Sequence, residues 1–561
     1  MNILTKTKNW FDTGEPWVWL NASAVSLSLL MVFGLLALIA YNGLGHFWPA
    51  DLMEAELVDG NRRIVLIGEI RDTETVLAQQ VRDAGIDLPE AVQVVKRLLI
   101  KQGNRDFYGL DFRWVLARDI QNKHYPKDLL SIERREWGQL YGRLVNVKTK
   151  GQVVKSDDPY HTLQARLAQV LVLHDLAEDI SRDEIGSINY SLEQLRLSEK
   201  KLHLKYKTDN NLSLQKKLLN IEQQRQSLQK KFAQLQNTLR QYHEKMAEDV
   251  MLVQLASGEI VEVALEKVIQ VIRPNAMGNG EKIAYYFHQI GAFISDDPRE
   301  ANTEGGIFPA IFGTVLMVII MSIMVTPLGV IAAIYLREYA SQGMMVRIIR
   351  IAVNNLAGVP SIVYGIFGLG FFVYFIGGSI DDLFYPEASP APVYGTPGLL
   401  WASITLALLT LPVVIVTTEE GLSRIPSSVR EASLALGATK FETLWYIVLP
   451  MVSPAMITGL ILAVARAAGE VAPLMLVGVV KLAPTLALDA NYPFLHLDRK
   501  FMHLGFHIYD VGFQSPNVEA ARPLVYATAL LLVVVIILLN LTAITVRNRL
   551  REKYKGLEHE S

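Results

Sequence analysis

The stretch that decides how this chain is organised reads Glu431-Ala432-Ser433-Leu434-Ala435-Leu436-Gly437-Ala438-Thr439-Lys440 and then Phe441-Glu442-Thr443-Leu444-Trp445-Tyr446-Ile447-Val448-Leu449-Pro450. The pattern predicts a helix that ends at Gly437 and a second, amphipathic helix that ends at Pro450. Gly437 allows the positive φ with which many helices end. The small side chains of Ala432, Ser433 and Ala435 let another surface approach closely. We interpret the stretch as a docking element, with a plain helix–loop–helix connector as the alternative.

Long apolar runs lie on both sides of this stretch. A hydrocarbon core of about 30 Å needs about 20 apolar residues in a helix. Six runs meet this requirement: 23–44, 307–335, 351–377, 398–417, 453–477 and 524–546. The sequence therefore predicts an α-helical integral membrane protein with six transmembrane helices, and the docking element joins the fourth to the fifth.

The composition agrees with a membrane protein that also carries a polar domain. Of the 561 residues, 51% are hydrophobic and 20% are charged, and the mean hydropathy is +0.24. The net charge of −2 gives no basic field for nucleic acid, so no nucleic-acid partner is expected. Because the chain has no cysteine, disulfides, thiolate catalysis and Cys-ligated metal centres are excluded.

Lysine and arginine in short loops predict the orientation in the membrane, because they concentrate on the cytoplasmic side. The loop at 378–397 has neither residue. The alternate segments are basic, at Lys6, Lys8, Arg337, Arg347, Arg350, Arg424, Arg430, Lys440, Arg547, Arg549, Arg551, Lys553 and Lys555. Both termini are therefore expected in the cytoplasm, and residues 46–303 are expected outside. Glu419 and Glu420, at the inner end of the fourth span, are interpreted as interfacial, and Arg337 and Glu338, at the end of the second, as anchors.

Residues 46–303 form one large insertion between the first two spans, and its clearest pattern is a coiled coil. Apolar residues alternate at steps of three and four along two series. The first series is Ile185, Ile188, Leu192, Leu195, Glu199, Leu202 and Tyr206, and the second is Leu214, Leu218, Ile221, Arg225, Leu228, Phe232, Leu235, Leu239, Tyr242 and Met246. Glu199 and Arg225 are the polar interruptions. A turn at Thr208–Asn211 favours an antiparallel hairpin over about 181–250, and a continuous helix that dimerises is the alternative.

The rest of the insertion is expected to be mixed α+β. Ser181-Arg182-Asp183-Glu184 is interpreted as a capping box that opens the first hairpin helix. Short strands are predicted at 63–67, 144–147, 251–255 and 260–263, because glycine-containing turns flank these apolar runs. His161, His174, His203 and His243 have no metal-ligand spacing, so no metal site is expected.

The stretch 431–450 resembles the EAA loop of ABC importer permeases. Glu-Ala-Ser, three residues, Gly, nine residues and Ile-x-Leu-Pro match that motif in spacing, with Ser433 in place of its second alanine. The resemblance implies the type I ABC importer permease fold. It also implies that the loop docks into a groove of a cytoplasmic ATPase and transmits its closure to the spans. The implied coupling residues are Glu431, Ala432, Ser433, Gly437, Ile447, Leu449 and Pro450.

The chain lacks the G-x-x-x-x-G-K-[ST] motif of an ATP site, so it is expected to be a transport subunit without ATPase activity or catalytic residues of its own. ATP and Mg would be bound by a dimer of partner ATPase subunits, and no cofactor is expected on this chain. The resemblance also implies a second, related permease subunit and a binding protein that delivers the substrate on the outer face.

Two further segments resemble phosphate-importer permeases in particular. They are Asn354-Asn355-Leu356-Ala357-Gly358-Val359-Pro360-Ser361-Ile362-Val363-Tyr364-Gly365 and Ala465-Arg466-Ala467-Ala468-Gly469-Glu470-Val471-Ala472-Pro473. The resemblance covers the five spans from about 305 to 546 and implies inorganic phosphate as the substrate, delivered by a periplasmic phosphate-binding protein.

The residues themselves indicate a pathway through the spans. Arg466 and Glu470 are ionisable, lie in an apolar run and are four residues apart, which would place them on one helix face. Arg466 offers a fork of donors to an oxyanion; the alternative is a structural ion pair between helices. Pro360 and Pro473 are expected to break helices where a pathway bends, or to introduce simple kinks.

The predicted organisation has four parts. Residues 1–45 hold the cytoplasmic N-terminus and the first span, residues 46–303 the periplasmic insertion, residues 304–546 the permease core, and residues 547–561 a basic cytoplasmic tail. The predicted function is ATP-driven import of inorganic phosphate across the bacterial inner membrane by alternating access. Two alternatives remain: a permease for phosphonate, sulfate or molybdate, and a membrane sensor with an extracytoplasmic coiled-coil domain.

Overall fold

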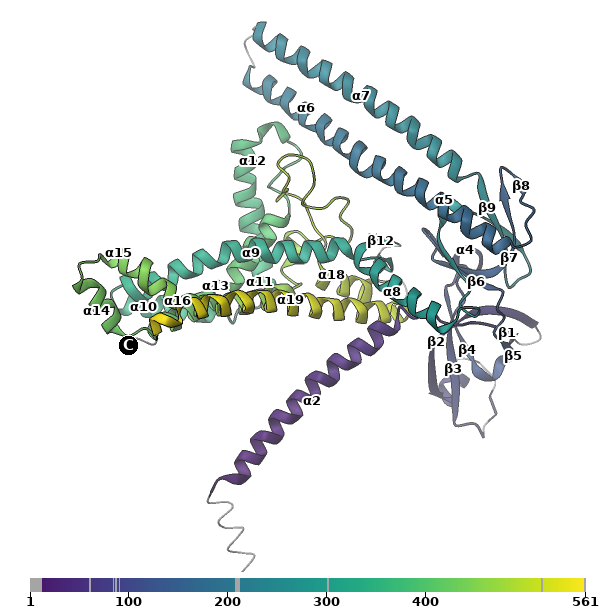
Figure 1. Cartoon of the computed structure of the whole chain (residues 1–561), viewed down its shortest axis with the longest axis horizontal. Coiled ribbons are helices and arrows are strands. Elements are labelled where there is room, and N and C mark those ends of the chain that lie inside the picture. Colours follow the sequence, from purple (N-terminus) through teal and green to yellow (C-terminus); the bar gives the residue numbers. More distant parts are fainter. Residues whose placement is uncertain are drawn as a thin grey trace, which may run out of the picture.

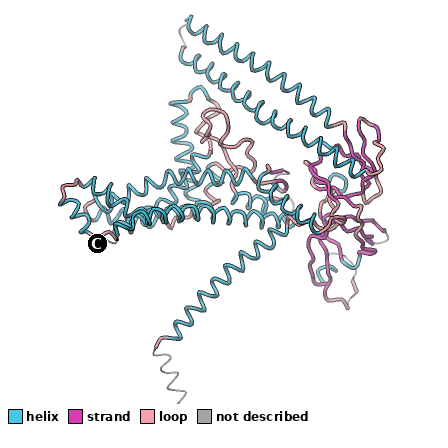
Figure 2. Tube along the Cα trace, in the orientation of Figure 1, coloured by secondary structure: helices cyan, strands magenta, loops and turns pink. Residues whose placement is uncertain are grey.

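The computed structural model of this chain has two parts (Figures 1 and 2). One part is a bundle of long helices, and the other contains the strands together with further helices. The structure describes residues 13–558, with gaps at 60–61, 84, 86–87, 90, 207–211, 300–301 and 516–517. In this part of the chain, six helices are long and apolar enough to cross a membrane: Pro16–Gly45, Phe308–Tyr339, Ser361–Phe384, Leu399–Ser423, Lys440–Gly469 and Ala521–Glu552. They fit the six predicted spans, with two differences in extent.

The third span begins later than expected. Residues 351–356 belong to a separate amphipathic helix, α10 (Met344–Leu356). The span itself is built from α11 (Ser361–Phe367), the π-helical η6 (Gly368–Gly377) and α12 (Gly378–Phe384). Pro360 explains the separation, because a proline disfavours helical geometry in the residue before it and starts a new helix well.

The fifth span lies closer to the N-terminus than expected. It consists of α15 (Lys440–Thr443), the π-helical η8 (Leu444–Val448) and α16 (Leu449–Gly469). The prediction that a helix ends at Pro450 is therefore wrong. Pro450 stands in the first turn of α16. The residues before it are π-helical, so their backbone hydrogen bonds join residues five apart, and the missing N–H of Pro450 does not stop the helix.

The permease core is built around α13 (Leu399–Ser423), the most enclosed span: 67% of its most apolar window is buried, against 0% for α2 (Glu15–Gly45). α13 packs against α9 (Phe308–Ile334) and α16, and α19 (Val518–Glu558) packs against α16. Close approach depends on glycine, since a Cβ at Gly329 would lie 2.6 Å from Val414. α2 lies outside this bundle and meets α19 where Gly43 touches the backbone of Ala527.

The insertion contains two antiparallel sheets. The first has the order β4-β3-β2-β1-β5, and the second has the order β10-β9-β7-β6-β11, with β8 on β7. Strands in the first sheet are β1 (Leu52–Asp59), β2 (Arg62–Leu77), β3 (Val94–Lys101), β4 (Phe112–Leu116) and β5 (Ile120–His124). Those in the second are β6 (Leu129–Arg134), β7 (Gln139–Thr149), β8 (Gln152–Val153), β9 (Asp249–Gln254), β10 (Ile260–Ala264) and β11 (Val268–Ile272). Short helices α3 (Ala78–Asp83), α4 (Arg105–Tyr108), η1 (Ala117–Asp119) and η3 (Leu265–Lys267) join them.

Two long helices extend from the second sheet and run side by side (Figure 1). One continuous helical segment consists of α5 (Pro159–Asp179), the π-helical η2 (Ile180–Ile185) and α6 (Gly186–Lys205), and α7 (Leu212–Met246) returns beside it. Leu163, Leu167 and Val170 bury α5 against the second sheet. Glu199 and Arg225, the two interruptions of the heptad pattern, form an ion pair between α6 and α7. The turn predicted at Thr208–Asn211 falls on residues that are outside the described part of the chain.

The predicted capping box at Ser181–Glu184 is wrong. The helical segment begins well before Ser181, at Pro159, and its N-cap is Asp158, whose carboxylate accepts hydrogen bonds from the amides of Tyr160 and His161. Asp158 takes the N-cap because Pro159 follows it at the first helical position, which proline favours.

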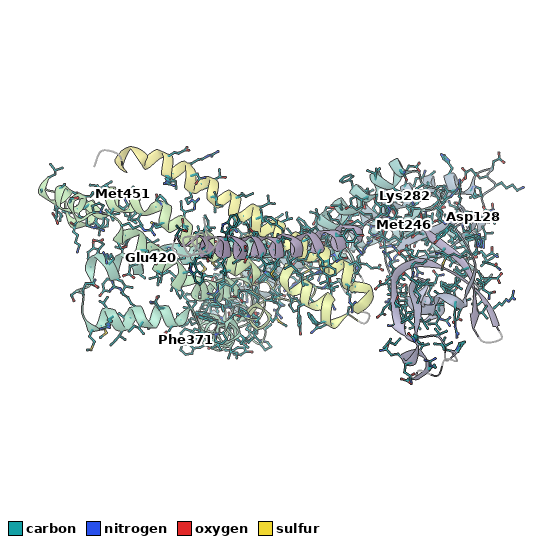
Figure 3. All side chains as sticks on the ribbon, turned by 90° about the horizontal axis from the view of Figure 1, so that it is seen from below. Asp128, Met246, Lys282, Phe371, Glu420 and Met451 are labelled. Carbon is teal, nitrogen blue, oxygen red and sulfur yellow. The ribbon has the colours of Figure 1, made fainter. Side chains whose placement is uncertain are left out.

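The insertion returns to the core through α8 (Asn279–Ser295) and the short strands β12 (Pro298–Arg299) and β13 (Glu304–Gly305). The two sheets of the insertion and the segment 431–450 lie at opposite ends of the molecule, whereas α6 and α7 run from the sheets back over the core (Figure 1). A view from below repeats this separation: Met451 and Glu420 lie toward one end, and Lys282, Met246 and Asp128 toward the other (Figure 3).

Candidate functional site

The EAA loop (431–450) folds as a tight turn between two helices. The first helix is α14 (Ser427–Ala435), and Gly437 follows it with φ of +90°. Thr439 caps α15 by accepting a hydrogen bond from the amide of Glu442, whose carboxylate accepts one from the amide of Thr439. Ser433 and Thr443 face each other inside the turn, with 2.8 Å between their hydroxyl oxygens. The turn is therefore held by its own polar contacts.

The outer face of this turn is apolar and exposed. Glu431 and Ala432 are exposed beside it. The large exposed side chains on it are Leu434, Leu436, Phe441, Trp445 and Tyr446. Leu436 is 89% exposed, and the rings of Phe441 and Trp445 stack 6.1 Å apart. An exposed apolar surface of this kind is typical of a site that another protein or the lipid bilayer covers, and Phe441, Trp445 and Tyr446 belong to the fifth span.

The predicted coupling residues divide into two groups. Glu431, Ala432 and Gly437 lie on the exposed side of the turn. Ser433 is 4% exposed, because its hydroxyl pairs with Thr443, so it supports the turn from inside. The last three, Ile447, Leu449 and Pro450, are half-buried along the start of the fifth span.

An ion pair that the sequence analysis missed fixes the loop to the second span. Arg430 donates to the carboxylate of Glu338 at 2.8 Å and to the carbonyl oxygen of Leu422 at 2.9 Å. Lys440 donates to the backbone carbonyl of Glu338 and lies over the ring of Tyr339, 4.7 Å from its centroid. From the sequence, Glu338 is interpreted only as an anchor at the membrane edge. Its position at the end of the second span, on the same predicted side of the membrane as Arg430, was the one sequence feature that suggested a pairing.

A second ion pair ties the neighbouring elements together. Arg350 of α10 approaches Glu419 of α13 to 2.6 Å. Glu419 is therefore engaged within the chain, whereas Glu420, which was grouped with it, is exposed. Through these pairs, α10, the second span and the fourth span form one support beneath the EAA loop.

The helix breaks of the third and fifth spans meet inside the core. Pro360 precedes α11, and Pro473 precedes the short α17 (Leu474–Val477). A Cβ at Gly365 would lie 2.7 Å from the Cα of Pro473, so the two broken segments touch. Both prolines thus occupy the residue directly before a helix, where the fixed φ of proline fits.

Arg466 and Glu470 lie beside this meeting point. Arg466 is in the last turn of α16, which ends at Gly469. The prediction of one shared helix face is wrong in one respect: Glu470 lies just beyond the helix, with extended backbone geometry. The two side chains still approach to 3.6 Å and are 32% and 21% exposed. Between residues 13 and 558, wherever the structure describes the chain, no cluster of His, Asp and Glu could hold a metal ion.

Comparison with known proteins gives this geometry a context. The sequence profile of the family described as "Binding-protein-dependent transport system inner membrane component" matches residues 325–554. The phosphate transport system permease protein PstA 1 of Mycobacterium tuberculosis is 34% identical over 43% of this chain and 71% of its own length. PstA of Yersinia pestis is 33% identical over 45% of this chain and 76% of its own length. This chain belongs to the ABC importer permease family.

Further similarities are lower in coverage or in sequence identity. PstA of Mycobacterium leprae is 39% identical over 31% of this chain, and the match spans only 52% of that protein. Among solved structures, the chain resembles the inward-facing MetNI methionine ABC transporter with 17% identity and a TM-score of 0.32, over 43% of this chain and 94% of that one. At that TM-score, the resemblance indicates no substrate.

Membership of the ABC importer permease family establishes the general role of this chain as a transport subunit. Permease subunits of this family are non-catalytic components of phosphate and other transport systems, and they work with an ATPase subunit and a binding protein. The profile begins at residue 325, so the insertion lies outside the part of this permease that the family shares.

Proposed function

We propose that this permease moves inorganic phosphate into the cytoplasm as the transmembrane subunit of an ATP-driven importer. The observation that carries the proposal is the similarity of this chain to several phosphate permeases, at 33–39% identity. Arg466 supports phosphate over a neutral substrate, because a guanidinium offers paired donors to an oxyanion.

The proposed orientation puts both termini and the EAA loop in the cytoplasm of a bacterium and the insertion in the periplasm. Two observations support it: the basic residues concentrate on the loop's side, and the loop and the two sheets of the insertion occupy opposite ends of the molecule (Figure 1). In this orientation α6 and α7 form a periplasmic antiparallel coiled coil on an α+β domain.

The proposed coupling runs through the EAA loop. An ATPase dimer, which binds ATP and Mg, would cover Glu431, Ala432 and the apolar side chains around Leu436. Its closure would then move the second and fifth spans together, because Arg430 and Lys440 fix the loop to Glu338 and its neighbour. A related second permease subunit completes the pathway, and a periplasmic phosphate-binding protein supplies it. The spans alternate between outward- and inward-facing states.

Radiolabelled phosphate uptake tests this function in cells that lack their own high-affinity system and express this chain with its neighbouring subunits. We expect wild type to take up phosphate. Arg466→Ala should lower the uptake rate at least tenfold, while the ATPase still co-purifies. Glu431→Ala should lose both uptake and ATPase co-purification. Arg424→Ala, an exposed basic residue near the loop, is the matched control and should behave as wild type.

Two results would change the assignment. If wild type imports sulfate, molybdate or a phosphonate but no phosphate, the permease role stands and the substrate is wrong. If no anion moves although the complex assembles, transport itself is wrong, and a sensory role for the insertion becomes the hypothesis to test.

A further inference from the structure

Helix α6 lies across two loops of the permease core. The first loop (385–398) follows the third span, and the second (478–503) follows the fifth. Lys201 approaches the carboxylate of Glu387 to 3.2 Å, and Lys200 donates to the carbonyl oxygen of Ser389. About three turns away on the same helix, Tyr190 donates to the carbonyl oxygen of Tyr492 at 2.6 Å. Helix α6 therefore contacts both loops at once.

Each loop has a fixed shape of its own. In the first, the carboxylate of Asp381 accepts hydrogen bonds from the amides of Tyr394 and Gly395 at 2.9 and 2.6 Å. In the second, Asp489 accepts from Arg499 at 2.7 Å and lies 3.0 Å from the ring of His496. The ring of His496 in turn meets the ring of Tyr190 edge to face, at 5.7 Å. Because these hydrogen bonds lie within a loop or join it to its own span, each loop can move as a unit with the span that carries it.

The contact between α6 and these loops is weak enough to open. Lys201 is 64% exposed and can return to water when the contact opens, whereas Glu387 is 8% exposed, so opening leaves a buried carboxylate without this partner. The remaining polar contacts are two single hydrogen bonds from side chains to backbone carbonyls, both exposed, and the ring contact of Tyr190 with His496 accompanies one of them. Within the described residues, the hydrophobic clusters of the core and of the insertion do not join across this contact.

At its base, α6 is attached firmly but through an irregular turn. α5 is buried in the core of the second sheet, whereas η2, between α5 and α6, is π-helical. Such turns are local defects that often occur at functional sites. In η2, Arg182 donates to Asp297 at 2.5 Å, and Asp297 lies in the segment that enters the second span. A movement of the second span can thus reach α6 through its base.

We propose that α6 is a strap that holds loops 385–398 and 478–503 together, and that it must leave them in each transport cycle. This proposal rests on the proposed transport function. The third and fifth spans, which carry these loops, also carry Pro360 and Pro473, where the two broken segments touch. Alternating access requires these spans to separate at one end. A helix bound to both loops would oppose that separation until it dissociates from at least one of them. The insertion thereby sets how readily the pathway opens on its own side.

The absence of cysteine from the chain makes a direct test possible. Lys201→Cys and Glu387→Cys are introduced together, and the assembled importer is treated in membranes with a short bis-methanethiosulfonate, a cross-linker that reductant removes. We expect substrate uptake to fall at least tenfold on cross-linking and to recover on reduction with dithiothreitol. Unchanged uptake by the fully cross-linked protein would overturn the strap and leave α6 as a static brace.

A matched pair controls for the chemistry. Glu199→Cys with Arg225→Cys joins α6 to α7 within the hairpin, where the wild-type side chains already pair. Because the hairpin would move as one body, this cross-link should leave uptake within twofold of the reduced protein. An equal loss in both pairs would contradict the strap, since it would show that any cross-link on the hairpin inhibits.

A second measurement separates this inference from the identity of the substrate. The rate of cross-linking between positions 201 and 387 is compared in the assembled complex without nucleotide and after trapping with ATP and vanadate. We expect at least a fivefold difference between the two states, whichever anion is transported. Equal rates would overturn the strap, whereas failure of phosphate uptake by the untreated wild type would overturn only the phosphate assignment.

Discussion

Glu338 and Arg430 show how much of the coupling geometry depends on single side chains. Their side chains are 11% and 21% exposed, and Arg430 is the cation that pairs with the carboxylate of Glu338. Removing one member of a poorly solvated pair leaves the other charge without compensation, which costs more than the pair contributes when intact.

Arg430→Met is therefore expected to lower the free energy of unfolding by about 1–3 kcal/mol, because it leaves the carboxylate of Glu338 poorly solvated and unpaired. The melting temperature of the purified permease measures this effect, and co-purification of the ATPase should fall with it. Arg424→Met, at an exposed basic position, should leave both unchanged. Equal melting temperatures for the two variants would contradict the role of the pair.

Two buried histidines lie outside the six spans. Burial lowers the pKa of His503 and of His507 from 6.5 to about 4, against a smaller opposing effect of Asp510 on His507. Lys481 and Thr528 also face this group: Lys481 pairs with Asp510 at 3.1 Å, and the hydroxyl of Thr528 lies 3.4 Å from His507. Both imidazoles are therefore neutral in the folded chain at neutral pH.

The pH dependence follows from this shift. Between pH 6.5 and pH 4 the unfolded chain binds a proton at each imidazole and the folded chain does not, so acid favours unfolding across this window. Each histidine accounts for a loss of about 3 kcal/mol, complete below pH 4. We expect His507→Gln to melt with a weaker dependence on pH than wild type between pH 7 and pH 4. Parallel curves for the two proteins would contradict the assignment.

At the scale of elements, the EAA loop depends on a turn that is stabilised from within. Ser433 and Thr443 are both 4% exposed, and they join α14 to α15 across the turn at Gly437. A buried hydroxyl that loses its partner is destabilising, whereas loss of both hydroxyls leaves nothing unsatisfied.

Thr443→Val alone should therefore destabilise the permease by about 1 kcal/mol and weaken ATPase association. The double variant Ser433→Ala with Thr443→Val should recover most of the loss in melting temperature. Purely additive effects of the two substitutions would show that the hydroxyls do not interact.

At the scale of the whole molecule, the proposed orientation predicts which surfaces face the cell exterior. Ser257 lies in the exposed turn between β9 and β10 of the insertion, and Leu436 is exposed in the EAA loop. In the cysteine-free background, a membrane-impermeant maleimide should label Ser257→Cys in intact spheroplasts, and Leu436→Cys only after lysis. Labelling of Leu436→Cys in intact spheroplasts would reverse the orientation.

The sequence by itself determined the features that depend on local pattern. Apolar runs are long enough to identify six spans without any partner. The heptad steps of α6 and α7 and the turn at Gly437 are also local signals, since periodicity and a positive φ are encoded residue by residue. The EAA spacing placed the loop between the right spans and indicated the family.

Only the tertiary structure decided the contacts between distant segments. The pairing of Glu338 with Arg430, of Glu199 with Arg225 and of Lys201 with Glu387 joins positions that are far apart in the chain. The helix breaks at Pro360 and Pro473 were visible in the sequence, but their contact was not. Which charge meets which depends on how whole helices pack, and no local pattern carries that information.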